Sequence, residues 1–172
     1  MSKNDKNTQT QEWTEEGYDK FLEEHPDYPI PEPIACLNLI MKREFAEAIV
    51  KGEKKVEIRA YTQHYVNRLY DAKTEDFVER HKEEPDILFW CDTLRSVEKI
   101  HFHNYNNTWS LDVECTLNDL VAPTDDGIAM LHEEYDCHEL DEIHRKLKRE
   151  GADEVPLFFY FELGNIIERK NI

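Results

Sequence analysis

One eight-residue segment combines residue types that could do chemistry at a single site: Gly52-Glu53-Lys54-Lys55-Val56-Glu57-Ile58-Arg59. Gly52 lets the backbone turn tightly and lets a ligand approach closely, and Lys54 supplies a mobile cation. Arg59 offers a planar fork for phosphate or carbonyl oxygens, and Glu57 can pair with it from two residues away. Together these residues predict a site for a small polyanion or a nucleoside.

The same residues leave two alternatives open. If burial desolvates Lys54, its amine could lose its proton near neutral pH and act as a general base in a hydrolase, with Glu57 as the second catalytic group. A Lys-x-x-Glu-x-Arg strand can also be only a solvated face that carries cross-strand ion pairs.

A helix is expected to lead into this segment. The pattern over Arg43–Lys51 is helical, and Gly52 follows where a left-handed helix end favours glycine. Phe45, Ala48 and Ile49 form the stripe that we expect to face the core.

A strand is expected to carry the rest of the segment. The residues after Lys54 alternate strictly, which predicts that Val56 and Ile58 face the core while Glu57 and Arg59 lie on the opposite face. In a regular strand, Lys54 would face away from Glu57 and Arg59. The three can share a cleft only if Lys54 lies on the glycine turn or at a bulge, and we expect the turn.

The whole chain predicts an α+β fold. Sequential strands with helical insertions favour a small mixed or antiparallel β-barrel with flanking helices over a doubly wound parallel sheet. The patterns predict helices at Thr14–Glu24, within Tyr61–Glu84, at Ile128–Tyr135 and at His138–Arg149, and strands at Ile34–Ile40, Ile87–Trp90, Val97–His103, Trp109–Cys115 and Leu157–Leu163.

The N-terminal part is expected to be an extension of one folded domain. Residues 1–33 comprise a polar tail, disordered over residues 1–10, then an acidic helix and a proline-rich connector, and residues 34–172 form the domain. The helix presents apolar residues that need burial, so we expect it to dock on the chain's own barrel, with a partner or a second copy as the alternative. These residues are Trp13, Tyr18, Phe21 and Leu22.

The eight-residue segment resembles the G-x-K-x-x-E-x-R signature of the ASCH family, a branch of the PUA-like superfamily. Leu37-Asn38-Leu39 before the helix and the stretch from Phe159 to Ile167 are also similar to that family, so the resemblance covers about residues 34–167. It implies a small β-barrel whose motif lines a cleft that meets RNA or a nucleotide. Fold alone does not choose between binding and catalysis.

Some similar proteins are hydrolases that act on acylated cytidine or on RNA. In the cytidine hydrolases a threonine stands at the position of Glu57, so only Lys54 carries over from them. The resemblance leaves the acidic partner of Lys54 open among Glu133, Glu134 and Asp136.

Aromatic residues extend the candidate site. Tyr61, Tyr65 and Trp90 could stack on a base or simply pack in the core, whereas Tyr105 lies in a polar turn and is the better stacking candidate. The predicted ligand-binding residues are Gly52, Lys54, Glu57, Arg59, Tyr61 and Tyr105.

Composition limits the partners. A net charge of -17 disfavours duplex DNA, although residues 41–59 hold six basic residues against four acidic ones, a local net charge of +2. We therefore expect RNA or a small nucleotide or nucleoside as the ligand, with a non-catalytic protein-interaction domain as a further alternative. No apolar run approaches about 20 residues and the N-terminus lacks a signal core, which predicts a cytoplasmic protein with no membrane partner.

Neither a metal nor a cofactor is expected. His101 and His103 share a strand face but have no third ligand with suitable spacing, and residues six apart such as His132 and His138 do not share one helix face. The four cysteines are widely spaced and predicted to be mostly buried thiols. The sequence leaves the oligomeric state open.

Overall fold

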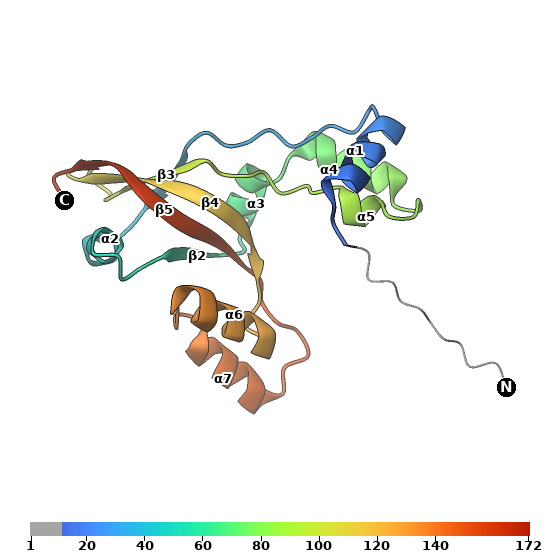
Figure 1. The fold of residues 1–172 in the computed structure, drawn as a ribbon. Helices are drawn as coiled ribbons and strands as arrows, with labels where there is room; N and C mark the ends of the chain where they lie inside the picture. Colours follow the sequence, from blue (N-terminus) through green and yellow to red (C-terminus); the bar gives the residue numbers. More distant parts are fainter. Residues whose placement is uncertain (1–11) are drawn as a thin grey trace. The chain divides into compact units, whose positions relative to one another are not determined.

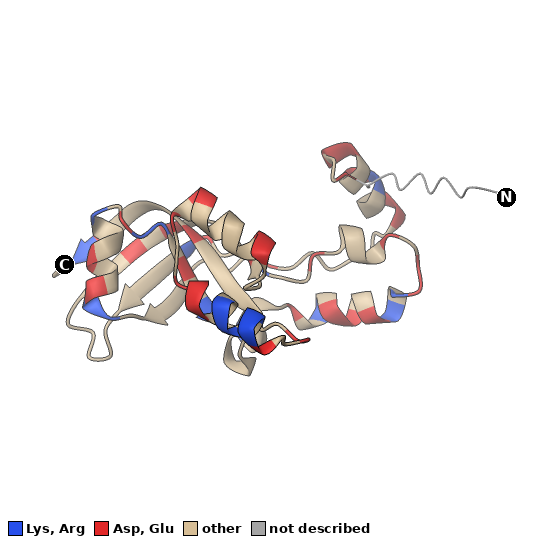
Figure 2. Cartoon of the chain, turned by 90° about the horizontal axis from the view of Figure 1, so that it is seen from below, with Lys and Arg blue, Asp and Glu red and all other residues tan. Residues whose placement is uncertain are grey.

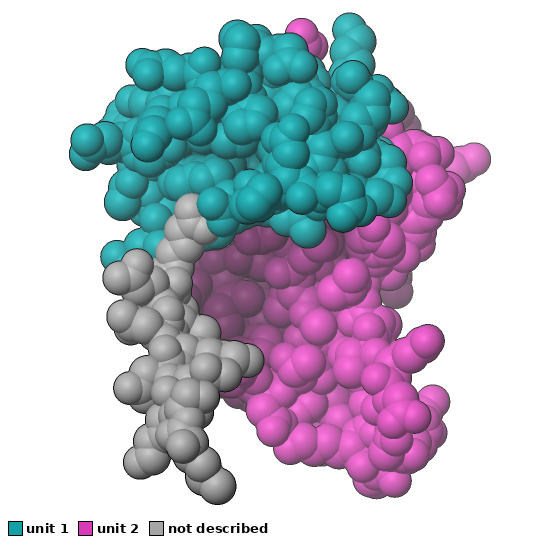
Figure 3. All heavy atoms as spheres, turned by 90° about the vertical axis from the view of Figure 1, so that its right-hand side faces the viewer, with its two compact units in different colours: residues 1–30, 72–93 teal, residues 31–71, 94–172 magenta. Residues whose placement is uncertain are grey.

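The computed structural model describes residues 12–172, so the expectation for residues 1–10 lies outside it. The described chain has an α+β fold, as predicted, and divides into two compact units (Figure 3). Of the described residues, one unit combines 12–30 with 72–93, and the other combines 31–71 with 94–172.

The larger unit is built on a five-stranded mixed sheet that curls into a half-barrel (Figure 1). β1 pairs with β3 in parallel, and every other neighbouring pair is antiparallel. β1 and β2 are therefore the two edges of the sheet. In spatial order the strands are β1 (Leu37–Ile40), β3 (Lys99–His103), β4 (Ser110–Val121), β5 (Phe158–Lys170) and β2 (Val56–Ala60).

One face of the sheet packs on helices α2 (Arg43–Val50) and α3 (Gln63–Leu69). The core there includes Phe102, Phe159 and Phe161, all almost fully buried. Register shifts in the β4–β5 pairing let these two long strands bend, because an extra residue in one strand increases the local twist.

The predicted inward stripe of α2 is partly wrong. Ala46 and Ile49 are buried, whereas Phe45 is 42% exposed and Ala48 is intermediate. The stripe is rotated towards Ala46, which leaves the Phe45 ring at the surface beside the glycine turn.

The other face of the sheet is covered by α6 (Asp125–Tyr135) and α7 (Asp141–Glu150), which lie beside β2 (Figure 1). Val56 and Tyr160 belong to the core on this side, together with Leu131 and Tyr135 of α6. Both faces of β2 are therefore covered, so the motif residues on this strand are shielded from solvent on either side: Val56 and Glu57 are both buried.

The smaller unit packs α1 (Glu15–Glu24) with α4 (Ala72–His81) and α5 (Ile87–Trp90). Phe21 is buried against Tyr28 and Phe77, while Trp13 remains 60% exposed. The apolar face of α1 is thus covered by the insertion at residues 72–93, so the expectation that this helix docks on the barrel is wrong.

The strand expected at Ile87–Trp90 is wrong, because the structure has a one-turn helix there. A short apolar run has no periodicity that separates a buried strand from a buried helix. The residues before and after it form no strand, and Asp86, at φ 68, turns the chain directly into the helix.

The other elements agree with the predictions within a few residues, except that β4 and β5 run further than expected. Cys91, Cys115 and Cys137 are buried free thiols and Cys36 is exposed. Burial raises the pKa of the three buried thiols to about 11. None of the helices in residues 12–172 is long and apolar enough to span a membrane.

Candidate functional site

The glycine turn brings Lys54 towards the strand that follows it. Gly52 has φ 76, and the next two amides, of Glu53 and Lys54, both donate to the Ala48 carbonyl at 2.9 and 3.1 Å. These bonds fix the turn to the end of α2. Lys54 lies on this turn, outside β2, as predicted.

Glu57 faces the core side of the half-barrel. It is paired with Phe161 across β2 and β5, and residues directly opposite in a sheet share a face. The residue is only 7% exposed, so the interpretation of this strand face as solvated is wrong. A buried carboxylate needs partners, because losing its hydration costs several kcal/mol.

Two cations supply those partners. Arg59 Nε donates to Glu57 Oε1 at 3.1 Å, and Lys54 Nζ lies 3.5 Å from Glu57 Oε2. Within residues 12–172, Glu57 Oε2 is nevertheless a buried oxygen that accepts no hydrogen bond, so its contact with Lys54 is an ion pair alone.

Arg59 is held on three sides. Besides its bond to Glu57, Nη1 donates to the Tyr65 hydroxyl at 3.3 Å and Nη2 donates to the Ile40 carbonyl at 2.9 Å. Ile40 ends β1, so this side chain links the two edges of the sheet. Each guanidinium nitrogen that was expected to bind a ligand therefore already donates a hydrogen bond within the protein.

Lys54 also contacts a carboxylate outside the predicted site, that of Glu139. Its Nζ lies 3.3 Å from both oxygens of Glu139, in the loop between α6 and α7, and 5.9 Å from the centre of the Phe45 ring. The Lys54 side chain is 11% exposed. Glu133 and Glu134, two of the three proposed acidic partners, are exposed on α6, and Asp136 bonds His138.

Two hollows meet at Lys54. One, of about 210 Å³, runs between the glycine turn and the loop after α6, and the other, of about 340 Å³, reaches Glu57 and Arg59. Phe45, Lys54 and Glu139 line both of them. We call these two hollows the Lys54 cleft.

Tyr61 and Tyr105, the two aromatic residues predicted to bind the ligand, lie at different distances from the Lys54 cleft. Tyr61 stacks on Phe159 with ring centres 5.1 Å apart and does not line the Lys54 cleft. Tyr105 is 84% exposed and lines a further hollow, of about 630 Å³, that shares Ile40, Met41 and Lys42 with the cleft. Tyr105 therefore stands beside the cleft, whereas Tyr61 is used in packing.

The carboxyl group of Glu57 has a raised pKa. Burial is the main cause, and it outweighs the lowering effects of Lys54 and Arg59. Between the ordinary pKa of about 4.3 and this higher value, the folded protein binds more protons than the unfolded chain, so Glu57 makes the protein less stable as pH rises.

Replacing Glu57 with glutamine removes this dependence. We expect the free energy of unfolding of wild type, relative to Glu57→Gln, to fall as pH rises from about 4 to 7, as measured by urea titrations at each pH. Glu53→Gln on the exposed turn controls for the loss of one charge. A relative stability of wild type that rises over this window would contradict the assignment.

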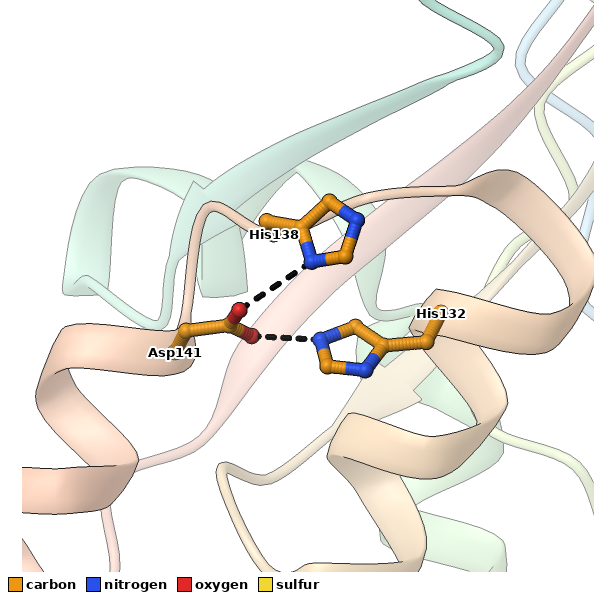
Figure 4. A group of neighbouring side chains, drawn as sticks. All are labelled: His132, His138 and Asp141. Atoms are coloured by element: carbon orange, nitrogen blue, oxygen red, sulfur yellow. Dashed lines mark hydrogen bonds and ion pairs between the residues drawn. The ribbon is translucent and has the colours of Figure 1, made fainter.

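His132 and His138 do not share a helix face, as predicted, but the conclusion that this spacing keeps them from forming a cluster is wrong. His132 and His138 have ring centres 4.3 Å apart, and both contact Asp141 (Figure 4). They meet across a helix end and not on one helix face, because Asp136, at φ 49, reverses the chain after α6. On β3, His101 and His103 are neighbours as predicted, and His101 bonds Asp112.

Comparison with known proteins adds no identity: no protein-family model, no curated protein and no solved structure matches this chain.

Proposed function

We propose that the larger unit is a PUA-like domain of the ASCH type and that its Lys54 cleft binds a nucleoside, either free or as one unit of a single-stranded RNA. The observation that carries this proposal is the position of Lys54 Nζ. A nearly buried amine lies between Glu57 and Glu139 where two hollows meet.

The charges of the cleft favour a polar ligand over a polyanion. Two cations, Lys54 and Arg59, are balanced there by two carboxylates, Glu57 and Glu139, and each guanidinium nitrogen of Arg59 already donates one hydrogen bond within the protein. An amine and a carboxylate side by side match the adjacent acceptors and donors on the edge of a base.

The size and the surroundings of the cleft are consistent with such a ligand. The 340 Å³ hollow is within the range of about 300–1,000 Å³ that is usual for small-molecule sites. Phe45 supplies an aromatic face at its rim, and the exposed Tyr105 ring stands beside it for a neighbouring base.

The charge distribution argues against a duplex ligand. Acidic residues are spread over the helices, and a basic run lies on α7 after its acidic first turn (Figure 2). With a net charge of -17, the chain offers no general attraction to phosphate, so a local site for one or a few nucleotides fits better.

Hydrolysis of an acylated nucleoside is the second candidate. It is favoured by one observation, the contact between Lys54 and the buried Glu57 Oε2, which accepts no hydrogen bond within residues 12–172. In this reaction Glu57 would take a proton from an attacking water, and Lys54 would stabilise the negative charge that develops on the substrate.

The test is a screen of free nucleosides, acylated cytidine and short single-stranded RNAs, read by calorimetry and by product formation. We expect Lys54→Ala to weaken nucleoside binding at least tenfold, because it removes the central donor of the cleft. Lys51→Ala, an exposed lysine on the same turn, makes the same charge change outside the cleft and should bind like wild type.

Tyr105→Ala separates the two forms of ligand. Stacking of one base contributes about 1–3 kcal/mol, so this variant should lose roughly five-fold to a hundred-fold in RNA affinity and little in nucleoside affinity. Product formation that is lost in Lys54→Ala would favour the hydrolase. Equal behaviour of wild type and Lys54→Ala towards every ligand would leave only the protein-interaction alternative.

A further inference from the structure

The junction of α6 and α7 gathers metal-ligating side chains that the proposed function does not use. His132 lies on the last turn of α6, His138 in the loop, and Asp141 begins α7. His132 Nε2 is 2.6 Å from Asp141 Oδ1, and His138 Nδ1 is 3.1 Å from Asp141 Oδ2 (Figure 4).

Backbone hydrogen bonds and buried neighbours anchor this arrangement. The amides of Asp136 and Cys137 donate to carbonyls of the last turn of α6, at 3.0 Å each. Cys137 and Leu140 are buried on either side of His138, and they anchor the loop to the core beneath α6. The three ligating side chains are therefore presented by a fixed corner of the fold.

We infer that His132, His138 and Asp141 form a binding site for one divalent transition-metal ion of the zinc type. One ligand atom from each residue lies within 4.8 Å of the other two. Bonds of about 2.0–2.2 Å at tetrahedral angles set neighbouring ligand atoms about 3.3–3.6 Å apart, so an ion fits after small side-chain rotations.

The surrounding groups support this assignment. Asp136 Oδ1 accepts a hydrogen bond from His138 Nε2 at 2.9 Å, which directs the other ring nitrogen, Nδ1, towards the site. A carboxylate behind a ligating histidine is the usual outer support of zinc sites, where it orients the ring and makes it more basic.

The donor set indicates the class of ion. Two imidazole nitrogens and one carboxylate suit zinc and its neighbours in the first transition row, whereas magnesium and calcium prefer oxygen ligands alone. Three protein ligands leave a fourth position for water or another ligand. His138 is 57% exposed in its side chain, so that position can open to solvent.

The site borders the Lys54 cleft but does not rest on its proposed function. His138 and Asp136 line the smaller hollow together with Lys54 and Glu139. A bound ion would therefore lie near that hollow, and the inference that it binds stands on the three ligands alone.

The experiment titrates the metal-free protein with Zn²⁺ against a chromogenic chelator and records visible absorption with Co²⁺. We expect one ion per chain and a tetrahedral Co²⁺ spectrum. Asp136→Asn should weaken binding about 10–100-fold through the supporting bond, and His132→Gln and Asp141→Asn should weaken it at least as much.

His144→Gln is the matched control. His144 Nε2 bonds Asp125 Oδ1 at 2.8 Å between the same two helices, but the described residues gather no third ligand there. This variant should keep wild-type Zn²⁺ affinity. Thermal melts without metal show whether each variant folds, and a substitution that unfolds the chain is replaced by His138→Gln.

Two results would overturn the inference. One is the absence of saturable Zn²⁺ binding to folded wild type, which would leave the cluster as a hydrogen-bonded network. The other is binding that survives in both His132→Gln and Asp141→Asn with unchanged affinity, which would place the ion elsewhere on the chain.

Discussion

Arg59→Ala is expected to lower the free energy of unfolding by about 3 kcal/mol, because it strands the buried carboxylate of Glu57. The substitution removes the bond to Glu57 Oε1 and leaves Lys54 as the remaining cation at that carboxylate. It also removes the bond to the Ile40 carbonyl, which ties β2 to β1. Urea denaturation at neutral pH measures the loss.

Removing the carboxylate as well should reverse much of this loss. The double variant Arg59→Met with Glu57→Met replaces a desolvated pair by apolar side chains of similar reach, next to Phe161. Such replacements are often neutral or stabilising, whereas breaking one half of a pair is costly. The four-way comparison of wild type, Arg59→Met, Glu57→Met and the double variant gives the coupling directly.

An exposed pair on α2 provides the control. Arg43 Nε bonds Glu47 Oε1 at 2.9 Å, but both side chains are about half exposed, so Arg43→Ala should cost less than about 1 kcal/mol. If Arg59→Ala proved no more costly than Arg43→Ala, burial of the Glu57 pair would not be what stabilises this edge of the sheet.

The sequence could predict the local geometry of the motif but not its burial. Alternation correctly separates Val56 from Glu57, and the glycine correctly places Lys54 on a turn. Alternation assumes that one face of a strand is wet, however, and β2 is covered on both faces. Only the register with β5, which pairs Glu57 with Phe161, shows that this carboxylate is buried.

Long-range partners explain the other differences. Glu139 reaches Lys54 across 85 positions in sequence, and no local pattern marks that approach. The cluster of His132 and His138 depends on one left-handed residue, Asp136, which is an aspartate among many in this acidic chain. Aspartate adopts this conformation more readily than most residues. The sequence therefore makes a left-handed residue at position 136 plausible, but it does not distinguish Asp136 from the other aspartates.

Gly127→Ala is expected to destabilise the protein by at least about 3 kcal/mol, although helix propensity alone predicts the opposite. Gly127 lies in the first turn of α6, where alanine is favoured by about 1 kcal/mol over glycine. A Cβ at this position would lie 1.9 Å from the Ala122 carbonyl oxygen. No side-chain rotation relieves a clash with a backbone atom.

The Ala122 carbonyl is not free to move. It accepts the Thr124 amide at 2.8 Å, while the Thr124 hydroxyl accepts the Gly127 amide at 3.1 Å and caps α6. Relief of the clash must therefore break the turn that starts the helix. Thermal and urea unfolding of Gly127→Ala measure the cost.

Gly52→Ala is the matched control, because it also adds one methyl group to a glycine of the same unit. A Cβ there meets nothing within 4 Å, so only the left-handed conformation at φ 76 is penalised, by about 1 kcal/mol. Equal losses in the two variants would mean that the contact with Ala122 is relieved by a cheap backbone shift.

The two glycines should also differ in their effect on the C-terminal helices. Gly127 lies in the first turn of α6, and the far end of this helix carries Tyr135 and leads into His138 and Glu139. A displacement of α6 would therefore move one wall of the Lys54 cleft. It would also move His132 and His138, two ligands of the inferred metal site. Gly127→Ala should therefore weaken both Zn²⁺ binding and nucleoside binding in the folded fraction, whereas Gly52→Ala, on the turn after α2 and outside the lining of both hollows, should leave Zn²⁺ binding intact. Loss of Zn²⁺ binding in Gly52→Ala alone would show that the corner between α6 and α7 is not held by the start of α6.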